Sequence, residues 1–423
     1  MYKNKVFLLV LSAFFFAQFA NSQNNTNSPY TRFGYGDISD NNSGEQRAMG
    51  GVSLGSRSHF SINNVNPASY SAVDSMTFMF DIGSSALISR FSDGTKTKAT
   101  TNANLEYINM QFPLSKRLGF SAGLLPYSFS GYSFNTSGKT TIESNTSIPD
   151  TISYSKYYNG SGGFSEVYTG ISANLFNHVS VGLNAYYMFG SLDNYRSLSF
   201  GGTTAYTGTT QINSIKANNF RFRLGAQFYN TFAQKHDVTL GLIFEPKAKL
   251  NGEYSQITTG VLTDTTLNSS TNSNFELPTM YGVGLNYNYD KKISIGLDYT
   301  MYEWTNAKYY GLTDTQSSLT NRSKLAFGAE YIPNIRGRKF SNRMRYRAGF
   351  NMSDTYYKVD GVAPGKNYGV SLGFGLPLHN SNTVVNATFE YGKIGGVSKL
   401  NEDYLKFTFN AVFNENWFFK RKL

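Results

Sequence analysis

The sequence predicts an all-β protein, a transmembrane antiparallel β-barrel of about fourteen strands. Three observations lead to this class. Charged residues make up only 15% of the 423 residues, whereas aromatic residues reach 16% and are nearly all Tyr and Phe. Apolar and small polar residues alternate along many segments of roughly ten to fifteen residues, as in the strands of membrane barrels. The chain also begins with a segment that has the features of a secretory signal.

The composition is that of a wall with lipid on one face and a polar lumen on the other. The chain has 31 Tyr, 34 Phe and 40 Gly, yet its mean hydropathy is negative. Lipid-facing and lumen-facing residues alternate along each strand of such a barrel, so both kinds must be abundant. There is no Cys. This excludes disulfides, thiolate metal sites and a lipidated N-terminal cysteine.

The N-terminus predicts export. Lys3 and Lys5 precede an apolar run from Val6 to about Ala20, and Ala20-Asn21-Ser22 fits a cleavage site. We therefore assign residues 1–22 to a signal peptide. The run is short for a transmembrane helix, and a retained N-terminal anchor is the alternative. Together with the barrel pattern, the signal places the protein in the bacterial outer membrane.

The barrel is expected over residues 75–423. Short connections such as Leu175–His178 and Asp290–Lys292 alternate with long polar excursions at 134–162, 255–275 and 305–321. Short periplasmic turns and long external loops are typical of these barrels, which have an even number of strands. A soluble sandwich or propeller is the alternative, but the segments match the ~9–11 residues of a tilted membrane-crossing strand. The predicted strands lie at 108–112, 118–124, 180–190, 221–232, 238–246, 281–290, 293–304, 324–333, 343–353, 368–378, 383–392 and 404–413.

The segment before the first strand carries a family resemblance. Asn66-Pro67-Ala68 lies within INNVNPASYS (62–71), and other pieces include SPYTRFGYGD (28–37), AMGGVSLG (48–55) and LPTMYGVGLNYN (277–288). This arrangement resembles the long-chain fatty acid transporter (FadL) family of outer-membrane barrels. The resemblance implies that residues 23–74 form a hatch that plugs a fourteen-stranded barrel, with Asn66, Pro67 and Ala68 as its motif. The alternative is a periplasmic loop leading to the first strand. The family's ligand-binding residues have no motif that matches here.

Motifs for catalysis are missing from the sequence. The four histidines, His59, His178, His236 and His379, lie in or beside expected turns, and none accompanies a G-x-S-x-G or H-E-x-x-H motif. Asp298 and Glu303 are five residues apart and so fall on opposite faces of a strand. The sequence therefore predicts no enzyme, no cofactor and no metal site.

The net charge of +11 includes a basic patch, and its members are Arg336, Arg338, Lys339, Arg343, Arg345 and Arg347. We interpret the patch as solvated loops and strand ends of an exported protein, not as a nucleic-acid site. Outer-membrane lipid and lipopolysaccharide are the expected surroundings. Two functions follow from the resemblance. One is passive uptake of hydrophobic, fatty-acid-like small molecules through a hatch-gated lumen. The other is an accessory barrel subunit in a larger outer-membrane complex for protein export, insertion or nutrient uptake.

Overall fold

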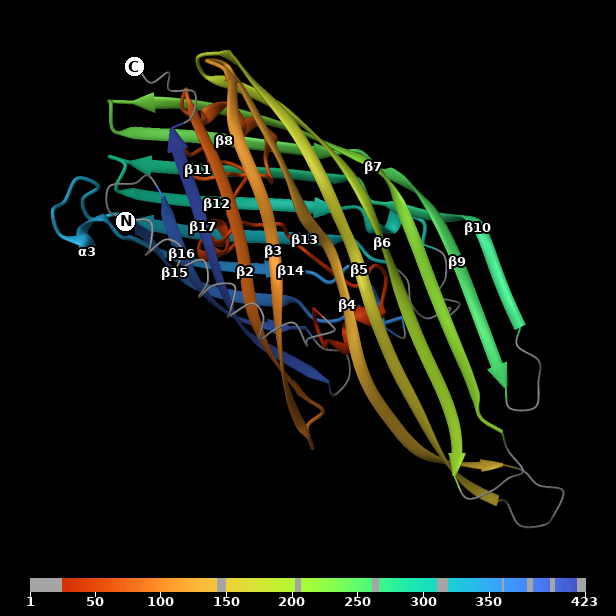
Figure 1. The fold of residues 1–423 in the computed structure, drawn as a ribbon. Coiled ribbons are helices and arrows are strands. Elements are labelled where there is room, and N and C mark those ends of the chain that lie inside the picture. The colour runs from red at the N-terminus through yellow and green to blue at the C-terminus, as the bar shows by residue number, and fades with distance from the viewer. Residues whose placement is uncertain are drawn as a thin grey trace, which may run out of the picture.

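A computed structural model describes residues 25–142, 150–201, 207–260, 266–309, 319–359, 361–378, 383–395 and 400–416. Most of them form one antiparallel sheet that closes on itself, because β17 (Asn401–Asn416) pairs with β2 (Thr77–Ser92). Figure 1 shows tilted strands with the N-terminal segment, in red, between the walls. The expected signal peptide, residues 1–22, lies outside the described ranges. No helix in these ranges is long and apolar enough to cross a membrane.

The remaining strands are β1 (Asp37–Ile38), β3 (Thr97–Ser115), β4 (Leu118–Ile142), β5 (Asp150–Phe176), β6 (Val179–Gly201), β7 (Thr209–Phe232), β8 (His236–Glu245), β9 (Ala248–Gly260), β10 (Thr266–Leu277), β11 (Met280–Tyr289), β12 (Ile293–Tyr302), β13 (Arg322–Tyr331), β14 (Arg345–Ser353), β15 (Asn367–Pro377) and β16 (Val384–Ile394). The short helices are η1 (Pro29–Arg32), α2 (Gly44–Ala48), η2 (Pro67–Ala72), η3 (Trp304–Asn306) and α3 (Phe340–Arg343).

Two of the barrel strands are interrupted. β8 and β9 both pair with β7, one after the other, and β10 and β11 pair with β9 and β8 in the same way. The breaks fall at Pro246–Lys247 and Pro278–Thr279, where proline has no backbone N–H to give to the ladder. When each interrupted pair is counted as one strand, β2 to β17 form a closed barrel of fourteen strands, as the sequence predicted.

The barrel is apolar outside and polar inside. Along β11, Leu285 faces outward and is 47% exposed, whereas the next residue, Asn286, faces inward and is 4% exposed. This reversal of the soluble pattern is what a lipid-facing wall requires. Outward tyrosines lie toward both ends of the short strands. Tyr289 and Tyr331 lie at one end and Tyr281 and Tyr299 toward the other, in the manner of aromatic girdles.

The wall is much taller on one side than on the other. β4 and β5 have 25 and 27 residues, whereas β11 and β12 have 10 each. The prediction of long loops at 134–162 and 255–275 was therefore wrong, since most of these residues lie in β4, β5, β9 and β10. A strand with both faces in water needs no apolar alternation, and these stretches are rich in Ser, Thr and Asn. Of the third expected excursion, residues 310–318 lie outside the described ranges.

Residues 25–76, which we call the plug, run through the lumen. Helix α2 packs against β14, β15, β16 and β17, whereas η2 packs against β3 to β7. Both helices begin with a capped N-terminus. Ser43 and Gln46 form a capping box at α2, and the Asn66 side chain accepts a hydrogen bond from Ala68 N–H at η2, with Pro67 as the first helical residue. The plug thus connects opposite walls of the barrel.

Glycines in the wall let the plug backbone lie directly against the strands. A β-carbon placed on Gly241 would stand 1.9 Å from the Leu54 carbonyl oxygen, and one on Gly349 would stand 1.9 Å from the Gly50 nitrogen. Neither distance is possible for a real side chain. The same holds where the plug meets Gly119, Gly182, Gly225 and Gly328.

We expect Gly241→Ala to destabilise the folded barrel by roughly 1–3 kcal/mol, because the new methyl group forces the plug away from β8. The measurement is the temperature at which the compact form on a semi-native gel converts to the unfolded form. Gly201→Ala is the matched control, since its β-carbon would meet nothing closer than 3.9 Å. Equal transition temperatures for the two variants would contradict the close contact.

Candidate functional site: the plug and the polar lumen

The three residues singled out in the sequence lie at the contact between the plug and the wall. Asn66 and Ala68 are fully buried, and Asn66 Nδ2 donates to the Leu54 carbonyl oxygen at 2.8 Å. Pro67 lies against Gly182 of β6 and Gly225 of β7. The structure therefore brings Asn66, Pro67 and Ala68 together in the interior. A gating role for them remains a prediction.

Side chains, more than regular structure, satisfy the plug backbone. Asp298 of β12 accepts hydrogen bonds from the backbone N–H groups of Ser53 (2.6 Å) and Leu54 (2.8 Å). Gln227 of β7 donates to the Leu54 carbonyl oxygen at 3.0 Å. Asp298 was considered in the sequence only as half of a carboxylate pair. Its role as an acceptor for the plug was missed, because nothing local to β12 signals a partner 244 residues away.

Ion pairs cross from the plug to the wall at three places. Asp40 contacts Lys324 at 2.7 Å and Arg322 at 3.2 Å, both on β13. Arg47 contacts Glu106 of β3 at 2.6 Å, and Lys406 of β17 contacts the other oxygen of Glu106 at 2.6 Å. These carboxylates hold their cations inside the barrel, where an unpaired charge would be strongly unfavourable.

The third place corrects the interpretation of the basic patch. Arg347 does not lie on a solvated loop: its guanidinium is fully buried between Glu45 of the plug, at 3.3 Å, and Glu330 of β13, at 2.6 Å. Arg336, Arg338 and Lys339 are exposed in the turn between β13 and β14, as expected. Sequence proximity therefore grouped residues of an exposed turn with Arg347, which β14 carries into the lumen.

A further cluster of charged side chains lies under the interrupted strands. Arg221 of β7 contacts Glu166 of β5 at 2.7 Å and Glu245 of β8 at 2.5 Å, and all three are buried. Arg223 also contacts Glu245, at 3.0 Å, and donates to the Val65 carbonyl oxygen of the plug at 3.2 Å. The cluster thus ties three strands and the plug together beside the break at Pro246.

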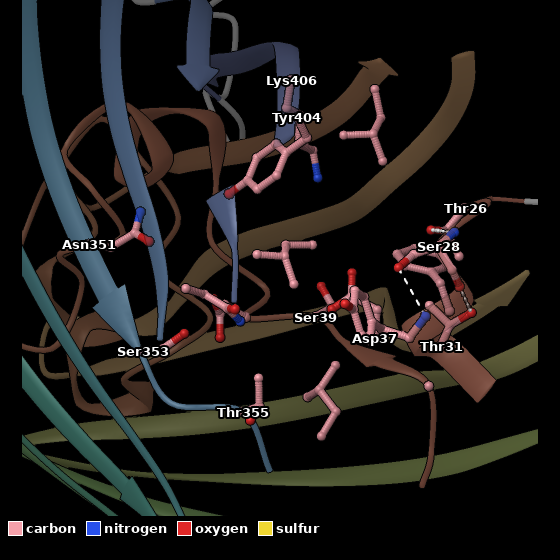
Figure 2. Close-up of a pocket in the computed structure, with 18 of the residues that line it drawn as sticks. Thr26, Ser28, Thr31, Asp37, Ser39, Asn351, Ser353, Thr355, Tyr404 and Lys406 are labelled. Atoms are coloured by element: carbon pink, nitrogen blue, oxygen red, sulfur yellow. Dashed lines mark hydrogen bonds between the residues drawn. The ribbon is translucent and has the colours of Figure 1, made fainter. Parts of the chain in front are cut away.

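The space left between plug and wall is polar. One cavity, shown in Figure 2, has a volume of about 200 Å³, and the residues around it include Ser39, Ser353, Thr355 and Tyr404. Ionisable side chains of both signs line it. The acidic and basic ones are Asp37, Asp40, Arg47, Glu106, Arg322, Lys324, Asp354, Glu390, Glu402 and Lys406. The cavity therefore has many more charged groups than a site for an apolar ligand, whose lining is mostly apolar with a few polar groups.

The pKa values of two plug carboxylates in this cavity shift in opposite directions. Burial raises the pKa of Asp40, but Lys324 and Arg322 outweigh it, so that the net pKa lies well below the ordinary value and the carboxylate is ionised. Burial also raises the pKa of Asp37, and Arg322 and Lys406 offset this only in part. Asp40 therefore acts as the fixed anion of the plug, whereas Asp37 takes up a proton at a higher pH than an ordinary aspartate.

The histidines hold separate positions. His59 lies 3.0 Å from Asp74 on the exposed part of the plug, His178 lies in a turn, and His236 contacts the Tyr287 hydroxyl group at 2.7 Å. His379 lies outside the described ranges. Glu303 precedes η3 and is not paired with Asp298. Within the described ranges, no group of three His, Asp or Glu residues is arranged to hold a metal ion.

A closed fourteen-stranded antiparallel barrel, apolar outside and filled by the segment before its first strand, is a bacterial outer-membrane protein with the FadL-like fold. A family model described as BamG matches residues 1–423, and the chain therefore belongs to the BamG family.

Solved structures agree on the fold. A FadL homologue from Pseudomonas aeruginosa superimposes with a TM-score of 0.60 at 13% identity, covering 88% of this chain and 98% of that one. The toluene transporter TbuX of Ralstonia pickettii gives 0.58 at 13%, covering 88% and 97%. The monoaromatic hydrocarbon channel CymD gives 0.56 at 12%, covering 91% and 99%. At these identities the likeness is one of fold. A search of curated proteins gave no match.

We expect Arg221→Met to lower the free energy of unfolding by about 3–5 kcal/mol, because Glu166 is left buried and without its cation. Urea unfolding of the reconstituted barrel measures this. The double variant Arg221→Met/Glu166→Gln should recover part of the loss, since it removes the unpaired charge. Arg117→Met, in the exposed turn after β3, is the control. A single variant as stable as this control would show that the cluster is not needed.

Proposed function

We propose that the protein is an accessory barrel subunit of a larger outer-membrane complex for protein export, insertion or nutrient uptake, and that its lumen stays closed. The observation that carries this is the way in which the lumen is filled. Plug and wall are joined by ion pairs on β3, β13 and β14 and by backbone contacts at wall glycines. A barrel whose lumen is closed in this way is better suited to a structural role in a complex than to the passage of molecules.

The lining of the lumen supports the same proposal. A channel for hydrophobic molecules needs an apolar route with few polar groups. The cavity beside the plug has many carboxylates, guanidinium groups and hydroxyls among its lining residues, and the smaller one near Asp298 and Arg221 is also charged. Membership of the BamG family extends over the whole chain and is compatible with a place in a complex.

Gentle detergent extraction from native membranes tests the proposal, followed by size separation and mass spectrometry of whatever travels with the barrel. We expect a stoichiometric set of partner proteins and no small apolar molecule. A monomer that carries fatty acids or other apolar compounds would contradict the accessory role and identify the ligand class.

Uptake of hydrophobic small molecules is the second candidate, and one observation favours it. An apolar recess of about 570 Å³ lies on the lipid-facing wall, next to the strand breaks. Leu224, Phe244, Tyr281 and Met301 are among its lining residues. Fold neighbours include proteins described as toluene transporters and a monoaromatic hydrocarbon channel. In this candidate, Asn66, Pro67 and Ala68 would move with a hatch to open the lumen.

A reversible lock distinguishes the two candidates. The Ser71 and Ser180 hydroxyl oxygens, one on the plug and one on β6, lie 2.7 Å apart, and the chain has no other cysteine to interfere with a Ser71→Cys/Ser180→Cys pair. If the hatch must move, oxidation should reduce uptake of toluene or oleate into vesicles, and reduction should restore it. For a scaffold with a fixed plug, we expect oxidised and reduced protein to behave alike. Each single-cysteine variant is a control.

A further inference from the structure

Strands β3 and β4 separate on the tall side of the barrel. They pair only from Ile108 with Leu124 down to Ser115 with Leu118, near their connecting turn. Above that point β3 no longer pairs with β4 and continues with β2, whereas β4 continues with β5 as far as Ile142. Figure 1 shows the two strands diverging toward the end that carries the long hairpins. In barrels of this class, that end faces the outside of the cell.

The plug covers the lower part of the opened edge of β4. Its two-residue strand β1 pairs there, with Asp37 opposite Phe129 and Ile38 opposite Ser128. Next along the edge, the Thr31 hydroxyl group accepts a hydrogen bond from Gly131 N–H at 3.1 Å. The protein therefore already adds short pieces of its own chain to this edge.

The edge continues beyond Gly131 without such cover. Among the described residues, none pairs with β4 on this side from Tyr132 to Ile142. Because Gly131 points its N–H to the open side, alternate residues of the strand do the same. These are Ser133, Asn135, Ser137, Lys139 and Thr141. The backbone N–H groups of the residues between them point toward β5. The register of the two strands places Ser137 opposite Ser155.

Natural edge strands are usually protected by proline, by several charges or by bulges that turn the edge away. From Tyr132 to Ile142 this edge has no proline and one charged residue, Lys139. The paired register with β5 is also regular there, since its shift lies earlier, between Pro126 and Ser128. A long, regular and weakly protected edge is a template for another strand.

We propose that the open edge of β4, residues 132–142, binds an extended segment of a partner protein as an added β-strand. This rests on the proposed function, since the partner is a subunit of the same complex. An extended polypeptide matches the alternating N–H and C=O groups one for one, which neither a lipid headgroup nor a sugar does. The added strand continues the line that β1 begins at Ser128 and Phe129.

Ser137→Pro tests the edge, and Ser137→Ala is the matched control. Proline removes the N–H of residue 137, which points to the open side, and the ladder to β5 does not use that group. Alanine removes the hydroxyl group and keeps the N–H. Both variants should keep the temperature transition of the wild-type barrel, which shows that each has folded.

The readout is amide-resolved hydrogen exchange of residues 132–142 in the extracted complex and in the isolated barrel. We expect the amides of Ser133, Asn135, Lys139 and Thr141 to exchange at least tenfold more slowly in the complex, in wild type and in Ser137→Ala. In Ser137→Pro this protection should be lost, together with at least nine-tenths of the partner. Slow exchange at alternate residues identifies an added strand, which co-extraction alone would not.

Other results overturn the idea. If the partner stays bound to Ser137→Pro and hydrogen exchange in this variant matches that of wild type, strand addition at the β4 edge is contradicted. The accessory role is not affected by that result. Protection that arises from a second copy of this chain would overturn the assignment to a different partner. A wild-type barrel that carries no partner would overturn the accessory role and the edge together.

Discussion

The structure depends on one constraint. Irregular backbone at membrane depth must find a partner for its polar groups, because lipid offers none. The plug has little regular structure, so the wall must supply acceptors and donors at the correct places. Asp298 accepts two N–H groups in succession, Gln227 donates to the Leu54 carbonyl oxygen, and Ser371 accepts from Gly50 N–H. The polar inner face of the barrel follows from this requirement.

Close contact is the second consequence. Backbone groups are short, and a side chain in the wall would hold the plug too far away to be satisfied. Glycines on β8 and β14 remove that obstacle, and the plug backbone lies against them. The high glycine content thus has a different cause here from the turns in which glycine is usually expected. It also limits how far the plug can shift without leaving its polar groups unsatisfied.

The buried charges specify the arrangement more than they stabilise it. Moving an ion out of water is unfavourable, and a pair in the interior roughly recovers that cost only when its geometry is good. Asp40 and Arg47 of the plug would each leave a buried charge on the wall without its partner if the plug moved, so placements that break these pairs are unfavourable. Charged side chains therefore lie throughout the space between plug and wall. This leaves the outer wall and the tall side of the barrel as the surfaces on which partners could act.

The sequence by itself determined the barrel, an approximate strand number and most strands of the short side, because lipid on one face imposes a period of two that is local to each strand. It did not identify the upper parts of β4, β5, β9 and β10, since strands with water on both faces carry no such pattern. Nor could it assign Asp298, Arg347 or the wall glycines. Their partners, Leu54, Glu45 and Gly50, lie hundreds of residues away in the chain. Only closure of the barrel around the plug brings those groups together, so the tertiary structure alone decided how the lumen is filled.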